Sequence, residues 1–350
     1  MKLWRFLWIA AGISAALLGT VPAEAAGPLR SPWDVPVAAH AASGKSQCST
    51  APDLPASIKT HDYYSDSAHS VIDPVRLKAY QQSISVWHHA ASTLDRMADR
   101  YRANGDTAMA GCVADWLDHF AQAGTLTGEM STNQATYVQG WMLGSFSIAW
   151  LKVRMAPTIS AAEAGRIGHW LGVVGALNSL YYAPRATKTD GRNNHRYWAG
   201  LAVMAAAIAA DRRDLYDWGV NSFGIGAAQI TPEGTLPLEM ARRALALHYH
   251  LFAAAPLVTM AELASANGDD LYHEDNGALL RLVHAAVAGI SNPAPFAAQT
   301  GIAQRPIKLN ADDIAWAAPF ERRFPDRELQ ALLSQATSHS VLYIGGLPPA

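Results

Sequence analysis

The sequence predicts an all-α fold, and three observations support this prediction. The chain has 350 residues, of which 50% are hydrophobic and only 16% are charged, so it can bury a large core. Apolar residues recur at helical spacing in one segment after another, and the connections between these segments contain Gly, Pro, Asn and Asp. Strand patterns are rare, and "SVLYI" at 340–344 is the clearest of them.

The predicted helices follow an irregular N-terminal region. Residues 27–73 are rich in Pro, Ser, Ala and His without a sustained period, which is typical of a loop that follows a surface. The pattern changes after the Asp73-Pro74 pair. From there the sequence predicts helices over 75–103, 106–123, 134–154, 159–182, 194–211, 213–230, 237–267 and 270–290, with a less regular one over 311–336.

Helices of similar length joined by short connections are compatible with three architectures. These are a bundle, a solenoid and a closed toroid of antiparallel helix pairs. The sequence contains no repeat of fixed period, which disfavours a solenoid. A toroid would leave a central cleft where the ends of several helices meet, and an extended ligand would lie there.

The first 25 residues have the pattern of a secretory signal peptide. Lys2 and Arg5 form the basic region, "LWIAAGISAALLGTV" is the apolar region, and "AEA" at 23–25 is the cleavage site. The apolar region is shorter than the roughly 20 residues that span a membrane, which disfavours an anchor. No later uncharged stretch is expected to approach the length needed to span a membrane. We therefore expect a single exported domain over 26–350, located in the periplasm.

Export affects the interpretation of Cys48 and Cys112, the two cysteines of the chain. In an oxidising compartment such a pair favours a disulfide, which stabilises a fold by about 4 kcal/mol in the chain-entropy model. The bridge would tie the irregular N-terminal segment to the helical body. Two buried free thiols are the alternative.

Charge and motifs exclude several classes of function. A net charge of −2 gives no overall field that would attract nucleic acid or an anionic membrane. The sequence lacks HExxH, CxxC and EF-hand patterns, and it lacks GxSxG; "FGIGAAQ" is not a nucleotide loop because its third glycine is missing. We expect no metal and no cofactor. A pair of catalytic carboxylates, as in glycosidases, stays open.

Polar groups gather in "DGRNNHRYWAG" at 190–200, directly before the apolar run "LAVMAAAIAA". Asn193 suits the N-cap of a helix. The first turn of a helix offers unpaired N–H groups and a positive dipole end. Together with Asn194 and His195, it is expected to form a receptor for a carboxylate.

A second candidate segment is "EMARRALALHYH" at 239–250. Arg242 and Tyr249 are seven residues apart, so on a continuous helix they would return to one face and could bracket a sugar ring. The alternative is an ordinary amphipathic helix in which Glu239 pairs with Arg242 or Arg243 on the solvent side.

The stretches "NNHRYWAG", "DRRDLYDWG" and "LPLEMARRALALHYH" together resemble the mannuronate-specific alginate lyases. "WLDHFAQAGTL" and "ANGDDL" agree as well, and the resemblance runs from about residue 48 to residue 277. The family consists of secreted polysaccharide lyases with an all-α fold, an incomplete α/α toroid with a central substrate cleft. The resemblance implies a Cys48–Cys112 disulfide, and it implies that the catalytic residues are Asn194, His195, Arg242 and Tyr249.

The resemblance also implies substrate contacts outside the catalytic residues. The family has a mobile lid, which corresponds to a loop around 55–72. Thr60 and His61 occupy lid positions that contact substrate, where a Lys is usual. Asn133 and Gln134 occupy contact positions in the loop before the third helix, where a His is usual.

Two further positions depart from the family pattern. Leu245 replaces the third arginine of "EMARRALALHYH", and Arg196 replaces the serine that follows the catalytic histidine. These changes leave the four implied catalytic residues in place, and they leave the choice of uronic acid open. Arg196 is predicted to read the substrate of this protein.

The implied activity is that of a carbon–oxygen lyase that cleaves 4-linked uronic-acid polymers by β-elimination. The expected partner is an anionic polysaccharide, and the protein is expected to be a monomer. Tyr249 would shuttle the C5 proton to the leaving oxygen and contact the substrate. His195 would be the base for a sugar of opposite C5 configuration. The alternatives are a lyase for another polyuronate such as polyglucuronate, a non-catalytic periplasmic polysaccharide-binding protein, and a hydrolase.

Overall fold

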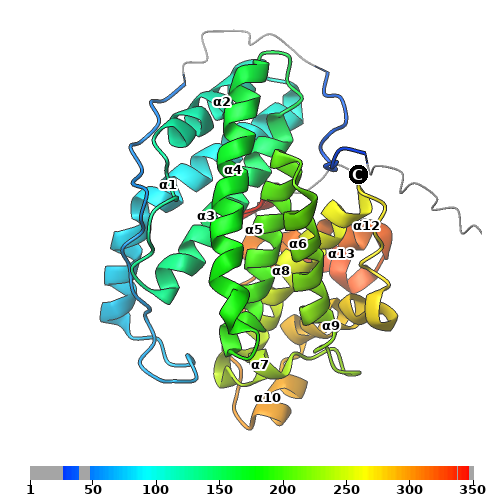
Figure 1. Cartoon of the computed structure of the whole chain (residues 1–350). Helices are drawn as coiled ribbons and strands as arrows, with labels where there is room; N and C mark the ends of the chain where they lie inside the picture. The colour runs from blue at the N-terminus through cyan, green and yellow to red at the C-terminus, as the bar shows by residue number, and fades with distance from the viewer. Residues whose placement is uncertain (1–26, 39–47, 337, 347–350) are drawn as a thin grey trace, which may run out of the picture.

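The structure is a computed structural model that describes residues 27–38, 48–336 and 338–346. The predicted signal peptide at 1–25 lies outside the described residues. The described part is almost entirely helical (Figure 1). Its longer helices are α1 (Pro74–Asn104), α2 (Thr107–Gln122), α3 (Asn133–Val153), α4 (Ala161–Tyr182), α5 (Asn194–Ala210), α6 (Arg213–Ala227), α8 (Ala246–Ser265) and α9 (Glu274–Ser291).

Shorter elements complete the fold. The single-turn helix α7 (Pro237–Met240) precedes α8, and the C-terminal part of the chain forms α10 (Ala294–Thr300), α11 (Ala311–Ile314), α12 (Ala318–Arg323) and α13 (Arg327–Leu333). The described strands are β1 (Ser340–Val341) and β2 (Gly345–Gly346), which pair as an antiparallel hairpin. The strand predicted at 340–344 is thus a very short one.

Most helices begin where the sequence predicts, because a polar side chain caps the first turn. Asp73 accepts hydrogen bonds from the amides of residues 75 and 76, directly before Pro74 at the first helical position of α1. Asp106, Thr132 and Ser160 cap α2, α3 and α4 in the same way. These caps are local signals, which explains why the boundaries were readable from the sequence.

Helix α5 is the central element. It packs against α3, α4, α6 and α8, and nearly all its side chains are buried (Figure 1). Alanine and glycine make these close contacts possible: a Cβ on Gly200 would lie 2.6 Å from the Cβ of Ser222 on α6. The run "LAVMAAAIAA" is therefore an interior helix whose first turn is held at a fixed place in the core.

The predicted helix over 237–267 is wrong in one important respect. The chain forms α7, then breaks, then forms α8. At the break Arg243 has a φ of 55°, in the left-handed region, which interrupts helical hydrogen bonding. The apolar period continues on both sides of the break, so the period alone did not reveal it.

The N-terminal segment and the disulfide lie as predicted. Residues 48–63 form an extended loop, drawn in blue beside α1 in Figure 1. Cys48 and Cys112 are joined, with their Cα atoms 5.3 Å apart. Trp116 on α2 also donates to the carbonyl of Ser49 at 2.7 Å. The loop is thus attached to α2 before it reaches the cleft.

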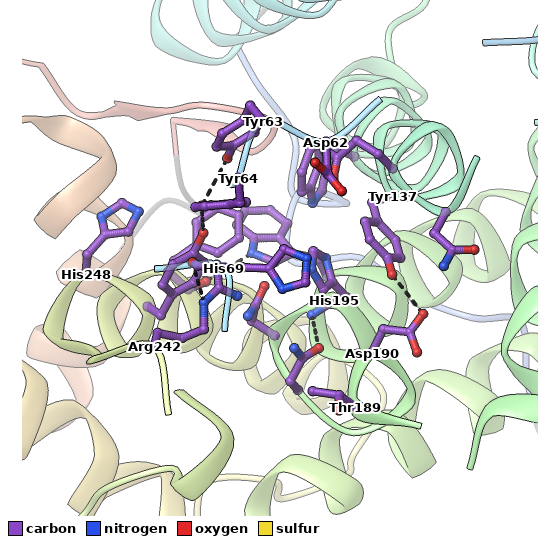
Figure 2. Close-up of a pocket in the computed structure, with 18 of the residues that line it drawn as sticks. Asp62, Tyr63, Tyr64, His69, Tyr137, Thr189, Asp190, His195, Arg242 and His248 are labelled. Carbon is purple, nitrogen blue, oxygen red and sulfur yellow. Dashed lines mark hydrogen bonds between the residues drawn. The ribbon is translucent and has the colours of Figure 1, made fainter. Parts of the chain in front are cut away.

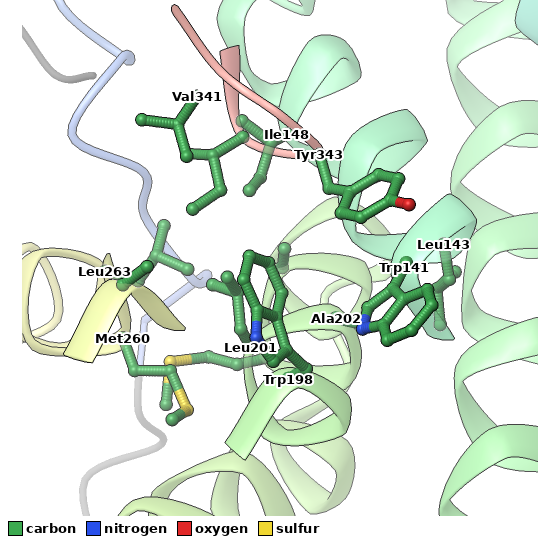
Figure 3. Packing of buried hydrophobic residues seen from close by; sticks show 14 of the residues in the cluster. Trp141, Leu143, Ile148, Trp198, Leu201, Ala202, Met260, Leu263, Val341 and Tyr343 are labelled. Carbon is green, nitrogen blue, oxygen red and sulfur yellow. The ribbon is translucent and has the colours of Figure 1, made fainter. Parts of the chain in front are cut away.

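The C-terminal hairpin inserts its side chains between helices. Tyr343 stacks on Trp141 of α3, with ring centroids 5.5 Å apart, and its hydroxyl pairs with His88 of α1 at 2.7 Å. Trp198 of α5 contacts the same tyrosine edge-on at 6.1 Å (Figure 3). The last described residues are therefore part of the core.

One helix of the described region, Arg243–Ser265, is long and apolar enough to cross a membrane by length and composition. The expectation that no later stretch approaches this length was therefore wrong. However, 83% of its most apolar window is buried inside the fold, as in the core helix of a globular protein.

Candidate active site

A cleft of about 1020 Å³ lies where the N-terminal ends of α3 and α5 meet the α7–α8 break. The loop 61–69 covers one side of it, and the hairpin residues 341–343 close another (Figure 2). All four predicted catalytic residues line this cleft, namely Asn194, His195, Arg242 and Tyr249. The structure therefore brings together side chains from two segments almost 50 residues apart, as a single site requires.

The first turn of α5 carries Asn194 and His195. Asn193 is the N-cap, and its side chain accepts from the amide of His195 at 3.1 Å. The backbone amide of Asn194 donates to Glu239 at 2.8 Å, and its Nδ2 lies 2.9 and 3.0 Å from the two oxygens of the same carboxylate. The prediction of a free helix N-terminus that receives a substrate carboxylate is thus wrong, because the side chain of Glu239 already occupies that place.

Glu239 contacts a candidate catalytic residue, and sequence reasoning did not single it out for the site. It is fully buried, and burial raises the pKa of its carboxyl group, while the hydrogen bonds from Asn194 and the charge of Arg242 oppose this rise. The alternative of a solvent-side ion pair with Arg242 or Arg243 is therefore excluded. The signal in the sequence was weak, since a Glu two residues after a Pro is common in the first turn of an exposed helix.

His195 is half-buried and stacks on Tyr137 of α3, with ring centroids 3.8 Å apart. Burial, together with a smaller effect of the nearby Arg242 guanidinium, lowers the pKa of the imidazole to about 3. Its Nδ1 has no hydrogen-bond partner among the described residues. The ring is thus neutral at neutral pH, and it contacts a ligand through hydrogen bonds rather than as a cation.

A buried aspartate fixes the ring that supports His195. Asp190 accepts a hydrogen bond from Tyr137 at 2.8 Å (Figure 2). It also accepts from Tyr181 at 3.0 Å and from Arg185 at 2.7 Å. Burial opposes ionisation of Asp190, but these donors hold its pKa below the ordinary value. The carboxylate therefore locks Tyr137 in place, and Tyr137 in turn orients His195.

Arg242 and Tyr249 meet, but not for the predicted reason. Because the chain breaks between them, they do not lie on one continuous helix. The guanidinium of Arg242 lies 3.6 Å from the centre of the Tyr249 ring, and its Nε donates to the carbonyl of His69 at 3.0 Å. This is the one side-chain hydrogen bond of Arg242 among the described residues, so its terminal nitrogens remain for an anion.

Tyr249 is a buried residue in the wall of the cleft. Burial raises the pKa of its phenol, and Arg242 partly opposes the rise. The phenol forms a hydrogen bond with Tyr64 of the loop that covers the cleft. The hydroxyl of Tyr64 also donates to that of Tyr63 at 3.4 Å. At rest Tyr249 is therefore a neutral phenol next to a permanent cation.

The loop 61–69, which lies in the region predicted to be a lid, contacts two of the candidate catalytic residues directly. Its tip is folded on itself, because Asp66 accepts from the amides of Ser70 and Val71 at 2.8 Å. Arg242 reaches the carbonyl of His69, and Tyr249 reaches Tyr64. The sequence did not single out Tyr64 or His69, although "HDYYSDSAH" is unusually rich in rings.

The predicted substrate contacts divide into two groups. His61, Asn133 and Gln134 line the cleft. Thr60 does not line it: its side chain is buried, with the hydroxyl 2.6 Å from that of Ser83 on α1, and its carbonyl accepts from Thr132 at 2.8 Å. Thr60 thus holds the base of the lid and does not face substrate.

Arg196 does not read the substrate from the cleft either. Its guanidinium is buried between α5 and α6, 3.8 Å from the Trp218 ring centre, and its Nε donates to Ser222 at 2.9 Å. Burial lowers its pKa to about 10. Successive residues of a helix point about 100° apart, so the neighbour of a cleft residue turns into the core. Leu245 is also buried outside the cleft lining.

The cleft has few cations for a site that binds an acidic polymer. Among its lining residues the permanent cations are Arg76 and Arg242, and Arg76 already pairs with Asp62 at 3.4 Å. Asp190 and Asp312 add negative charge. In the described residues no cluster of three or more His, Cys, Asp or Glu side chains is arranged to hold a metal ion. Arg242 is thus the main positive charge that a carboxylate would meet.

Comparison with known proteins identifies the family. The sequence pattern of the alginate lyases matches residues 57–296. The chain belongs to the alginate lyase family. It is a carbon–oxygen lyase that acts on polysaccharides, and Asp312 and residues 341–343 of its cleft lie beyond the matched region.

Relatives agree along most of the chain. A polysaccharide lyase from Stenotrophomonas maltophilia is 36% identical over 295 residues, which are 83% of this chain and 86% of the relative. An alginate lyase from Pseudomonas entomophila is 33% identical over 285 residues, covering 79% and 77%.

Solved structures of alginate lyase A1-III, an α/α toroid, confirm the predicted fold class. A variant complexed with a tetrasaccharide superposes with a TM-score of 0.76 at 20% identity, over 87% of both chains. The enzyme from Sphingomonas species A1 superposes with a TM-score of 0.69 at 23% identity, over 81% of this chain and 80% of that one. At these identities the likeness concerns the fold.

Proposed function

We propose that this lyase cleaves the mannuronate blocks of alginate by β-elimination, and that it does so in the periplasm after export. The observation that carries the proposal is the meeting of Arg242, Tyr249 and His195 in one cleft, with the guanidinium 3.6 Å from the tyrosine ring. Elimination from a uronic acid needs a cation for the carboxylate, a group that removes the C5 proton, and a group that protonates the 4-linked oxygen.

The first requirement is neutralisation of the carboxylate. The C5 proton is a poor acid while the adjacent carboxylate carries its full charge. The terminal nitrogens of Arg242 can bind that carboxylate in a bidentate manner, and the neutral ring of His195 can donate one hydrogen bond. The sequence predicted Asn194 to be part of the receptor for this carboxylate. In the structure its amide nitrogen faces Glu239 instead, so Arg242 and His195 are the remaining donors.

The second and third requirements concern one proton. The C5–H bond breaks, its electrons form the C4=C5 double bond, and the bond from C4 to the linking oxygen breaks. Tyr249 as phenolate takes the C5 proton and then protonates the departing oxygen, so the enzyme returns to its starting state. Since burial raises the pKa of this phenol, the phenolate depends on Arg242 next to its ring.

Stereochemistry limits the substrates that one shuttle can serve. In mannuronate the C5 proton and the 4-linked oxygen lie on the same side, so a single side chain reaches both. Glucuronate shares this configuration and differs at C2. Guluronate has the opposite C5 configuration and needs a base on the other side, for which His195 is the candidate.

A polyglucuronate lyase is the second candidate function. Two observations favour it: the lid and loop positions hold His61, Asn133 and Gln134, and the Stenotrophomonas relative bears the broader name polysaccharide lyase. The catalytic groups do not distinguish mannuronate from glucuronate, because both present the same atoms at C4 and C5. Discrimination must therefore come from contacts with the remaining hydroxyls.

Product analysis on defined polymers tests the proposal. The mature chain is incubated with polymannuronate, polyguluronate and polyglucuronate, and unsaturated ends are followed by their ultraviolet absorbance. We expect the fastest reaction with polymannuronate. Faster cleavage of polyglucuronate would favour the second candidate, while new reducing ends without absorbance would indicate a hydrolase. Binding measured by calorimetry without any product would indicate a binding protein.

A further inference from the structure

We propose that Glu239 is a positioning residue for catalysis: it fixes the side-chain amide of Asn194 so that Oδ1 is presented to the substrate as a hydrogen-bond acceptor. This inference rests on the proposed lyase activity. Glu239 does not line the cleft, whereas Asn194, whose orientation it fixes, does.

The hydrogen bonds of Glu239 define this orientation. A carboxylate only accepts hydrogen bonds, so the amide of Asn194 must turn its nitrogen toward it. Nδ2 lies 2.9 Å from Oε1 and 3.0 Å from Oε2, and the backbone amide of Asn194 lies 2.8 Å from Oε1. Three contacts to one residue fix both the backbone and the amide plane of Asn194.

The opposite end of the same amide has no partner. Oδ1 of Asn194 is buried and accepts no hydrogen bond from any described residue, although Asn194 lines the cleft. A buried polar atom without a partner costs about 1–3 kcal/mol, which a ligand with an O–H donor would recover. The sugar hydroxyls are donors of this kind.

The charge of Glu239 suits its place. It lies at the first turn of α5, where the helix dipole and the free amide groups favour an anion. Its own chain segment also carries Arg242, whose amide donates to the carbonyl of Glu239 at 3.0 Å. Glu239 on the short helix α7 therefore orients the side-chain amide of Asn194 and also binds the backbone amide of Arg242.

A double-mutant cycle tests this role. Glu239→Gln keeps the shape of the side chain but places an N–H₂ group opposite the Nδ2 of Asn194, so one contact becomes a contact between two donors. We expect kcat on polymannuronate to fall about 10- to 100-fold, as for a small misplacement of a catalytic group, with KM changed less than about threefold. In an Asn194→Ala background, the same substitution should change kcat less than about twofold.

Glu262→Gln is the matched control. Glu262 is another buried carboxylate with three hydrogen-bond contacts, from Tyr272 and Arg323, and it does not line the cleft. The Glu262→Gln variant should lower the melting temperature as much as Glu239→Gln does, but it should not show the loss in kcat. An equal loss of kcat with and without Asn194 would overturn the inference, and so would full activity of Glu239→Gln.

A readout that needs no turnover separates the inference from the proposed function. The amide resonances of Asn194, assigned by comparison with Asn194→Ala, should shift in Glu239→Gln and stay unchanged in Glu262→Gln. Unchanged resonances in Glu239→Gln would overturn the positioning role. A wild-type protein that forms no unsaturated product from any polyuronate would instead refute the proposed function.

Discussion

Lys152 ties the C-terminal wall of the cleft to the core, and its removal gives a quantitative prediction. Its side chain is fully buried on α3, and Nζ lies 2.5 Å from Asp99 and 3.0 Å from the carbonyl of Ile344. Asp99 in turn accepts from the amide of Gly346 at 2.6 Å. One ammonium and one carboxylate therefore hold the hairpin that carries Tyr343.

The substitution Lys152→Met keeps the volume and removes the charge. It leaves Asp99, whose side chain is 26% exposed, beside the buried Asp95 with no cation between them. Breaking a buried pair from one side costs about 3–5 kcal/mol, and the partial exposure of Asp99 places this case near 3 kcal/mol. For a chain of this size that lowers the melting temperature by roughly 4–5 °C. KM should rise, because residues 341–343 line the cleft.

Thermal unfolding at a fixed scan rate measures the first effect, and initial rates on the best polymer measure the second. Lys152→Met with Asp99→Asn should regain part of the lost stability, since the unpaired charge is removed. Arg212→Met is the control: this arginine forms a pair with Asp214 that is exposed on both sides, worth less than about 1 kcal/mol. A melting temperature of Lys152→Met within about 2 °C of wild type would refute the reasoning.

Three further predictions concern the site and the core. Tyr249→Phe should abolish formation of unsaturated product by about 100-fold or more while polymer binding by calorimetry persists; appreciable turnover would remove Tyr249 from the proton transfer. Arg196→Met should lower the free energy of unfolding by about 1–3 kcal/mol without changing the ratio of rates on the three polyuronates. A changed ratio would show that Arg196 does influence the choice of substrate. Burial raises the pKa of Asp95 to about 7, so the folded state keeps a proton that the unfolded chain releases near pH 4, and the free energy of unfolding falls as pH rises from about 4 to 7. Asp95→Asn should remove this fall, at most roughly 4 kcal/mol, in denaturant titrations; an unchanged slope would assign it to other groups.

Much of the fold followed from the sequence because its signals are local. A cap such as Asp73, a break such as Gly105 and an apolar period each act within a few residues, so the ends of most helices lie within one to three residues of the prediction. The candidate catalytic residues were predicted in another way. Asn194, His195, Arg242 and Tyr249 came from the resemblance, and the residues alone left capping and an amphipathic helix as alternatives.

The directions of side chains were not available from the sequence. Arg196 and His195 are neighbours, yet one lies between α5 and α6 and the other lies in the cleft. Thr60 and His61 are neighbours too, yet Thr60 is buried away from the cleft and His61 lines it. Which neighbour faces the cleft depends on how a helix or loop is rotated against distant elements, and that rotation is decided by packing.

The sequence by itself determined the helical class, most helix boundaries and the pair of cysteines that could bridge. Only the tertiary structure decided that the α7–α8 break brings Arg242 onto the ring of Tyr249, that Tyr64 and the C-terminal hairpin close the cleft, and that Glu239 fills the first turn of α5. The reason is physical: periodicity and capping depend on neighbours along the chain, whereas the orientation of a buried polar group depends on the partner that satisfies it, and that partner lies far away in sequence.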